Sequence, residues 1–184
     1  MKRIFVAILL LFTWLALSNS TVAAAMGSGN PYLDAQTGVT YSLYKPVNTS
    51  GLVQTKFSLL DCGVGIEQWV AVRFASGKKV IEVMQTMAGV HCSNPGLAKK
   101  LPSVKVGNVS ASVYVFCDPA KAVAFKKCSS ADIKTVGGYM TFRLPGYYKM
   151  KATDIEVLAT GGFTYSQLLA VSRSMTPAST TASN

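Results

Sequence analysis

The chain has 184 residues, four cysteines and a formal net charge of +10, which suits a single basic domain with a hydrophobic core. After residue 17, no segment is apolar over the length that a membrane-spanning helix needs, so we expect a soluble mature protein. A basic chain favours anionic surfaces, but a high isoelectric point without a specific partner fits the composition equally well.

Residues 1–25 are predicted to be a signal peptide. A positively charged start and an apolar run over residues 4–17 precede three alanines at 23–25, the small residues that a signal peptidase reads. We expect cleavage near Ala25 and a secreted or extracytoplasmic protein. The alternative is an uncleaved N-terminal anchor.

A single domain is expected over residues 39–176, after a flexible lead-in at 26–38 that is rich in Gly, Asn and Pro. In its first half, apolar residues recur with period two, the pattern of half-buried strands. This pattern predicts strands over 39–45 (stopped by Pro46), 55–62, 67–75 and 79–87, the last two joined as a β-hairpin.

In the second half, residues 88–102 are predicted to be a long loop. Two strands follow within 103–117, around a turn at Gly107 and Asn108. Further strands are predicted over 137–146 and 152–160, after a polar loop at 118–135 with one helical turn. Because no helix longer than two turns is predicted before residue 163, the sheet of about eight strands must be largely antiparallel.

The C-terminal segment changes to helical periodicity. Thr164 and Gln167 form a predicted capping box, and Phe163 and Leu168 are spaced as a hydrophobic staple. The helix of about eleven residues should end before Pro177, with Leu168, Val171 and Met175 on its apolar face, and residues 177–184 should be a disordered tail. Such a short helix needs an apolar surface to lie on. We therefore predict an α+β fold, a curved antiparallel sheet covered by one C-terminal helix.

The four cysteines indicate disulfides in an exported chain. Their spacing fits no zinc pattern, and four cysteines allow three connectivities. We predict Cys117–Cys128, which closes a short loop, and Cys62–Cys92, which ties the second strand to the loop after the hairpin.

No catalytic, cofactor-binding or metal-ligating constellation is evident, so we expect no enzymatic activity and no cofactor. The only histidine, His91, precedes Ser93 by two residues, but no orienting carboxylate is close in sequence. Glu82 and Glu156 lie within predicted strands, where we expect them on solvated faces.

Paired lysines lie in predicted turns and loops. They are candidates for a basic rim that contacts an anionic surface, or else they serve solubility and the protection of sheet edges. These residues are Lys78, Lys79, Lys99, Lys100, Lys126, Lys127, Lys149 and Lys151. Asn48 and Asn108 begin glycosylation sequons, which matter only in a eukaryotic secretory pathway.

The segments "AVRFASGKKVIEVMQT", "VKVGNVSASVYVF" and "ATDIEVLATGGFTYSQLLAVSRSM" resemble an uncharacterised bacterial extracytoplasmic domain family. Its members often lie behind anti-sigma-factor-like membrane proteins, and the resemblance covers about residues 67–175. It implies a sheet with a terminal helix. It implies no catalytic residue, and Tyr165, Ser166 and Gln167 replace the acidic residues usual in the first helical turn.

Two hypotheses of function follow, and a third is more remote. The first is a monomeric, non-enzymatic binding module at the cell envelope, whose partner is an envelope protein, a lipid or an anionic polymer, not a specific nucleic acid sequence. The second is a carrier of apolar ligands or lipids in a cleft between sheet and helix. The third is a hydrolase whose acidic residues converge only in the fold.

Overall fold

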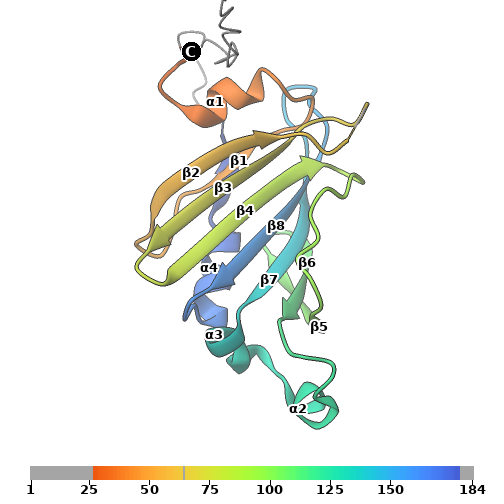
Figure 1. Cartoon of the computed structure of the whole chain (residues 1–184). Helices are drawn as coiled ribbons and strands as arrows, with labels where there is room; N and C mark the ends of the chain where they lie inside the picture. The colour runs from red at the N-terminus through yellow and green to blue at the C-terminus, as the bar shows by residue number, and fades with distance from the viewer. Residues whose placement is uncertain (1–26, 64, 179–184) are drawn as a thin grey trace, which may run out of the picture.

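The computed structural model describes residues 27–63 and 65–178. The predicted signal peptide and the last six residues of the predicted tail lie outside these ranges. The fold is α+β, as predicted: a seven-stranded antiparallel sheet, a two-stranded sheet, and a C-terminal helix that packs against the large sheet (Figure 1).

The large sheet has the strand order β2-β3-β4-β8-β7-β6-β5. Its strands in chain order are β2 (Val53–Leu60), β3 (Trp69–Ser76), β4 (Lys79–Met87), β5 (Lys99–Val106), β6 (Val109–Val115), β7 (Gly138–Leu144) and β8 (Thr153–Thr160). Two runs of sequential strands thus meet at the β4–β8 pair. Because β5 lies at the far edge, the chain from β4 to β5 must pass across β8, β7 and β6.

The inner face of this sheet forms the core. Register partners place Val72, Val83, Val157, Met140 and Val113 in one row across five strands, and all are buried. The predicted face of β3, with Val70, Val72 and Phe74, is part of this core. Period-two patterning therefore identified the inner face correctly.

A second layer covers the inner face. It consists of helix α1 (Pro31–Gln36), the pair β1 (Tyr44–Pro46) and β9 (Met175–Pro177), and helix α4 (Tyr165–Arg173). The side chain of Gln85 joins the layers, because it accepts a hydrogen bond from the Tyr44 N–H at 2.8 Å and donates to the Tyr44 carbonyl at 2.9 Å.

Helix α4 begins as predicted. Thr164 and Gln167 form the capping box, and Phe163, Leu168 and Val171 are fully buried. The helix ends at Arg173, earlier than predicted. Met175 belongs to β9 instead of the helical face, since pairing with β1 satisfies the backbone that follows α4.

Several boundaries were predicted wrongly. The lead-in contains α1, whose Tyr32 and Ala35 are buried in the core. Two residues of the predicted tail belong to the fold, because Pro177 lies in β9 and the Ala178 N–H donates to the Leu43 carbonyl at 2.8 Å.

The strand predicted over 39–45 is reduced to β1, which contains Pro46 and pairs with β9 outside the large sheet. Pro46 can lie there because this small sheet is only two strands wide. With β9, the described residues form nine strands instead of eight.

Two predicted loops contain additional structure. The last four residues of the predicted loop at 88–102 belong to β5. The predicted loop at 118–135 contains the expected helical turn, which is α2 (Ala122–Lys127). It also holds a 3₁₀ turn (Ser130–Asp132) and helix α3 (Ile133–Val136), whose Ile133 is buried.

The structure pairs Cys62 with Cys92 and Cys117 with Cys128, as predicted, with Cα–Cα distances of 5.2 and 6.5 Å. Two disulfides fit an oxidising environment. In the described part of the chain, no helix is both long and apolar enough to cross a membrane.

Candidate functional site

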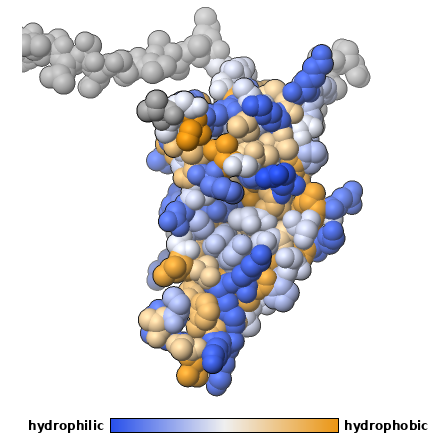
Figure 2. Space-filling model, turned by 90° about the vertical axis from the view of Figure 1, so that its right-hand side faces the viewer, coloured by the Kyte–Doolittle hydropathy of each residue, from blue (hydrophilic) through white to orange (hydrophobic). Residues whose placement is uncertain are grey.

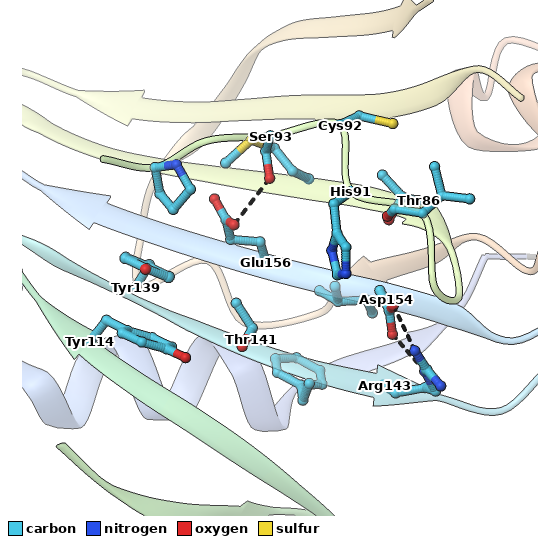
Figure 3. A pocket seen from close by; sticks show the side chains of 15 residues that line it. Thr86, His91, Cys92, Ser93, Tyr114, Tyr139, Thr141, Arg143, Asp154 and Glu156 are labelled. Carbon is cyan, nitrogen blue, oxygen red and sulfur yellow. Dashed lines mark hydrogen bonds and ion pairs between the residues drawn. The ribbon is translucent and has the colours of Figure 1, made fainter. Parts of the chain in front are cut away.

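The connection from β4 to β5, residues 88–98, forms a pocket on the outer face of the sheet. The strand order forces this connection across β8, β7 and β6, so its side chains stand above those strands (Figure 3). The pocket between connection and sheet, which is open to solvent on one side, has a volume of about 560 Å³, within the usual range of sites for small molecules.

The floor of the pocket is built from cross-strand neighbours. Thr86, Asp154 and Arg143 form one row, and Met84, Glu156 and Thr141 form the next. A third row places Tyr114 beside Tyr139. Alternation along β4, β6, β7 and β8 thus gives a polar, partly aromatic outer face opposite the apolar inner one.

The two tyrosines form an aromatic wall. Their rings are stacked, with centroids 4.5 Å apart and an interplanar angle of 7°. Burial, together with the neighbouring Tyr114 and Glu156, raises the pKa of Tyr139 to about 12. Its hydroxyl therefore stays protonated at neutral pH and serves as a hydrogen-bond donor or acceptor.

Glu156 lies deepest among the acidic residues of the pocket, only 9% exposed. Its Oε2 accepts a hydrogen bond from Ser93 Oγ at 3.1 Å, whereas its Oε1 is buried and has no partner among the described residues. Burial raises the pKa of this carboxyl, and the Ser93 bond only partly opposes that effect. We expected Glu156 on a solvated face; this was wrong, because the 88–98 connection covers it.

Asp154, two residues earlier on β8, has a lowered pKa, in contrast to Glu156. Burial acts to raise its pKa, but the hydrogen bonds from Arg143 and Gly89 and the electrostatic interactions with Arg143 and His91 together lower it. Arg143 donates to both carboxylate oxygens, at 2.6 and 2.8 Å, and the Gly89 N–H donates at 2.8 Å. Asp154 is therefore a fixed anion at neutral pH.

The pocket roof is held at several points. The Gly89 and Ser93 bonds tie it to β8, and Thr86 Oγ1 donates to the Val90 carbonyl at 2.8 Å. The disulfide from Cys92 to Cys62 ties it to the end of β2. Together these contacts position His91 and Ser93 above the sheet (Figure 3).

The structure thus brings His91 and Ser93 together with the carboxylates that the sequence does not show nearby. They are separated from Asp154 and Glu156 by about sixty residues in the chain. The sequence signal for the floor was the alternation of Asp154 and Glu156 on one face of a strand. The signal for the roof was absent, since the crossing depends on the strand order.

A second, shallower hollow lies near Met87 and Lys151. Both Thr40 N–H and Thr40 Oγ1 donate to the Glu67 carboxylate there. Both Glu67 carboxylate oxygens therefore already have a hydrogen-bond donor. The pocket beneath residues 88–98 is the stronger candidate for a binding site.

The predicted basic residues do not form one rim. Lys78, Lys79, Lys99, Lys100, Lys126 and Lys127 lie towards one end of the sheet, and Lys149 and Lys151 lie at the other. Lys99 Nζ is engaged by the carbonyl oxygens of Lys126 and Cys128 at 2.7 and 2.8 Å. The other seven are exposed, and their contact with an anionic surface stays a prediction.

No group of three or more His, Cys, Asp or Glu side chains in residues 27–63 and 65–178 is arranged to hold a metal ion. Comparisons with protein-family models, curated proteins and solved structures find no match for this chain. The function must therefore be inferred from the pocket itself.

Proposed function

We propose that this protein is an exported binding module that holds a saccharide unit of an envelope polymer in the pocket beneath residues 88–98. One observation carries the proposal: Glu156 Oε1 is buried in the pocket without a hydrogen-bond partner among the described residues. A buried carboxylate oxygen without a partner is costly, and a ligand hydroxyl or N–H group would satisfy it.

The surrounding side chains favour a ligand rich in hydroxyl groups. Thr141, Ser93 and the Tyr139 hydroxyl supply neutral donors and acceptors, and the stacked tyrosines offer an aromatic wall for the apolar face of a ring. Asp154 is already paired with Arg143, so Glu156 is the one acidic side chain of the pocket lining that is left for a ligand. This combination suits a neutral sugar better than a strongly ionic ligand.

Export is supported by two features. The N-terminal pattern predicts a signal peptide, and the two disulfides fit an oxidising environment. The resemblance to extracytoplasmic domains agrees with such a location. An apolar-ligand carrier is less well supported, because the side chains of α4 that face the sheet are fully buried and the pocket lies on the opposite face.

The test uses His91 as a reporter. It is the only histidine in the chain and lines the pocket, so its imidazole NMR signals report on ligand entry without ambiguity. Hexose and N-acetylhexosamine oligosaccharides should shift these signals in a saturable way. Glu156→Gln should weaken the binding at least about tenfold, since a hydrogen bond to a charged group contributes about 1.5–3 kcal/mol.

Glu82→Gln is the matched control. Glu82 lies on the same outer face but pairs with Arg73 at 2.6 Å outside the pocket, so its replacement should leave binding unchanged. Equal binding by Glu156→Gln and the unmodified protein would exclude the pocket as the saccharide site.

Hydrolysis of the bound saccharide is a second candidate. The pocket contains one carboxyl with a raised pKa, Glu156, and one with a lowered pKa, Asp154, the pairing of a general acid with a base. They lie two residues apart on one strand, so both project from its outer face into the pocket, and a pair of carboxyl groups is what glycosidases use to cleave a glycosidic bond. If the protein releases reducing ends from these oligosaccharides and Glu156→Gln abolishes the release, the activity is hydrolysis. Binding without release would show that the protein is a binding module only.

A further inference from the structure

The segment closed by the Cys117–Cys128 disulfide projects from one end of the sheet. It contains α2, none of whose residues is buried, and Figure 1 shows this helix at the tip of the molecule, away from the sheet. A helix of six residues with no buried face contributes nothing to the core. Its exposed composition therefore needs a different explanation.

The tip combines apolar and cationic side chains. Ala122, Val123 and Ala124 are exposed, Val123 by 70%. Lys121, Lys126 and Lys127 flank them and are also exposed. At this end of the molecule, Figure 2 shows hydrophobic side chains directly beside hydrophilic ones.

The segment is held in place although it is not packed. Lys99 Nζ binds the carbonyl oxygens of Lys126 and Cys128 and lies 5.9 Å from the centre of the Phe125 ring. The disulfide closes the segment at its base. These contacts occupy the carbonyl groups at the end of α2, while the side chains of Lys126 and Lys127 stay exposed.

Further charges at the same end have the same sign. Lys100, next to Lys99 on β5, and Lys134 on α3 are exposed near the segment, whereas Asp118 and Asp132 bind the backbone N–H groups of Ala120 and Ser129. The tip is therefore an apolar point in a cationic surface.

We propose that the Cys117–Cys128 segment docks on the anionic surface of a lipid bilayer. In this arrangement Val123 and the neighbouring alanines enter the interfacial region, and the lysines contact lipid phosphates. Apolar residues ringed by lysine are the pattern of segments that lie in the membrane interface, and juxtaposed lysines are attracted by anionic headgroups. An anionic polymer in water would explain the lysines but not the exposed valine.

The experiment measures co-sedimentation of the chain from Met26, which retains every described residue of the fold, with lipid vesicles. We expect binding to vesicles that contain phosphatidylglycerol, little binding to pure phosphatidylcholine, and release by high salt. Lys126→Glu with Lys127→Glu should lower the partition coefficient at least about tenfold. In a Val123→Trp variant, vesicles should shift the added fluorescence to shorter wavelength.

Lys149→Glu with Lys151→Glu is the matched control, because it changes the net charge equally at the opposite end of the sheet. It should retain binding. The proposal would be overturned if both double variants lost vesicle binding equally, or if the protein bound equally to the two kinds of vesicle. It would also be overturned if vesicles left the fluorescence of the Val123→Trp variant unshifted while the protein bound a soluble polyanion. Circular dichroism checks that the variants are folded, and the saccharide titration of His91 should be unaffected by them.

Discussion

The carboxyl group of Glu156 shows how one residue depends on a distant segment of the chain. On β8 alone it would point to solvent, as alternation with the buried Ile155 and Val157 requires. The Ser93 hydroxyl and the backbone around it cover this position and leave Oε1 without a partner among the described residues. Glu156 therefore costs folding stability, which is typical of residues kept for binding or catalysis.

The stability of the protein should depend on the protonation of Glu156. Burial raises the pKa of Glu156 above its ordinary value of 4.5, so above pH 4.5 the folded protein retains a proton that the unfolded chain has lost. The free energy of unfolding should therefore fall as pH rises through this window. Glu156→Gln should flatten this part of the profile in chemical denaturation between mildly acid and neutral pH.

Asp154 supplies the control of opposite sign. Its pKa is lowered from 3.8, so its contribution is present above that pH and lost as the pH falls through its lower value in the folded protein. Asp154→Asn should change the profile only on the acid side. A neutral-pH slope that Glu156→Gln leaves intact would contradict the assignment to Glu156.

Gly161 is required by a close approach of two backbones. Its φ is +74°, and a Cβ there would lie 1.7 Å from the Lys78 carbonyl oxygen. Gly161→Ala should destabilise the protein by more than about 3 kcal/mol, because the obstacle is backbone and cannot move aside. Gly77 has a φ of +58° but open space around it, so Gly77→Ala should cost only about 1–2 kcal/mol. Equal melting temperatures for the two variants would refute the clash.

Among the elements, α4 and the 88–98 connection have contrasting roles. Helix α4 is too short to persist alone, and its capping box determines only where it begins. Its stability comes from the inner face of the sheet, where Leu168 and Val171 are fully buried. The connection is instead held by a few polar bonds and one disulfide on the outer face.

Leu168→Ala tests the role of α4. We expect the free energy of unfolding to fall by about 2–5 kcal/mol, from lost burial and the cavity left behind. Leu97→Ala is the control, because Leu97 is 78% exposed and should change stability by less than about 0.5 kcal/mol. Thermal denaturation compares the two, and equal melting temperatures would mean that α4 is a detachable arm.

Replacing Cys62 and Cys92 with serine tests the pocket roof. Loss of the disulfide should lower stability by about 3–4 kcal/mol, mainly by relaxing the unfolded chain, and should speed amide hydrogen exchange selectively in residues 88–98. Replacing Cys117 and Cys128 removes the disulfide that closes the shorter loop, at the other end of the sheet. This change should leave hydrogen exchange in residues 88–98 unchanged. If both pairs loosen 88–98 equally, the Cys62–Cys92 bridge does not hold the roof locally.

At the scale of the whole molecule, the two ends of the chain close the core together. Segment 39–46 crosses the inner face, where Tyr41 donates from its hydroxyl to the carbonyl groups of Gln68 and Gln85 at 3.1 and 3.0 Å. β9 then pairs with β1 after α4. The core is complete only when both segments are in place, so folding depends on contacts that span nearly the whole domain.

A chain that ends at Arg173 should show this dependence. It lacks β9 and the bond from Ala178 to Leu43, which exposes one side of β1 and removes several backbone bonds of about 1 kcal/mol each. We expect a melting temperature lower by many degrees than that of a chain ending at Ala178, which keeps these contacts. Identical melting curves would show that β9 is dispensable.

Much of this architecture is encoded locally. The alternation in β3, β4 and β8, the capping box at Thr164 and the Cys117–Cys128 disulfide were predicted correctly, because period two, helix caps and short cysteine loops depend on residues that are close in the chain. The Cys62–Cys92 disulfide was predicted correctly as the pair that remained. Short elements were not predicted where tertiary contacts, and not the local composition, stabilise them. The glycine-rich lead-in contains α1, for example, because Tyr32 and Ala35 are buried in the core.

Local sequence patterns thus specify the antiparallel sheet, its inner face and the terminal helix. The strand order, in contrast, became clear only from the fold: β8 lies beside β4, which sends residues 88–98 across the outer face and places Ser93 over Glu156. The same strand order divides the lysines between two ends of the sheet. Strand order results from the packing of the whole core, so no local pattern in residues 88–98 indicates which strands they will cross.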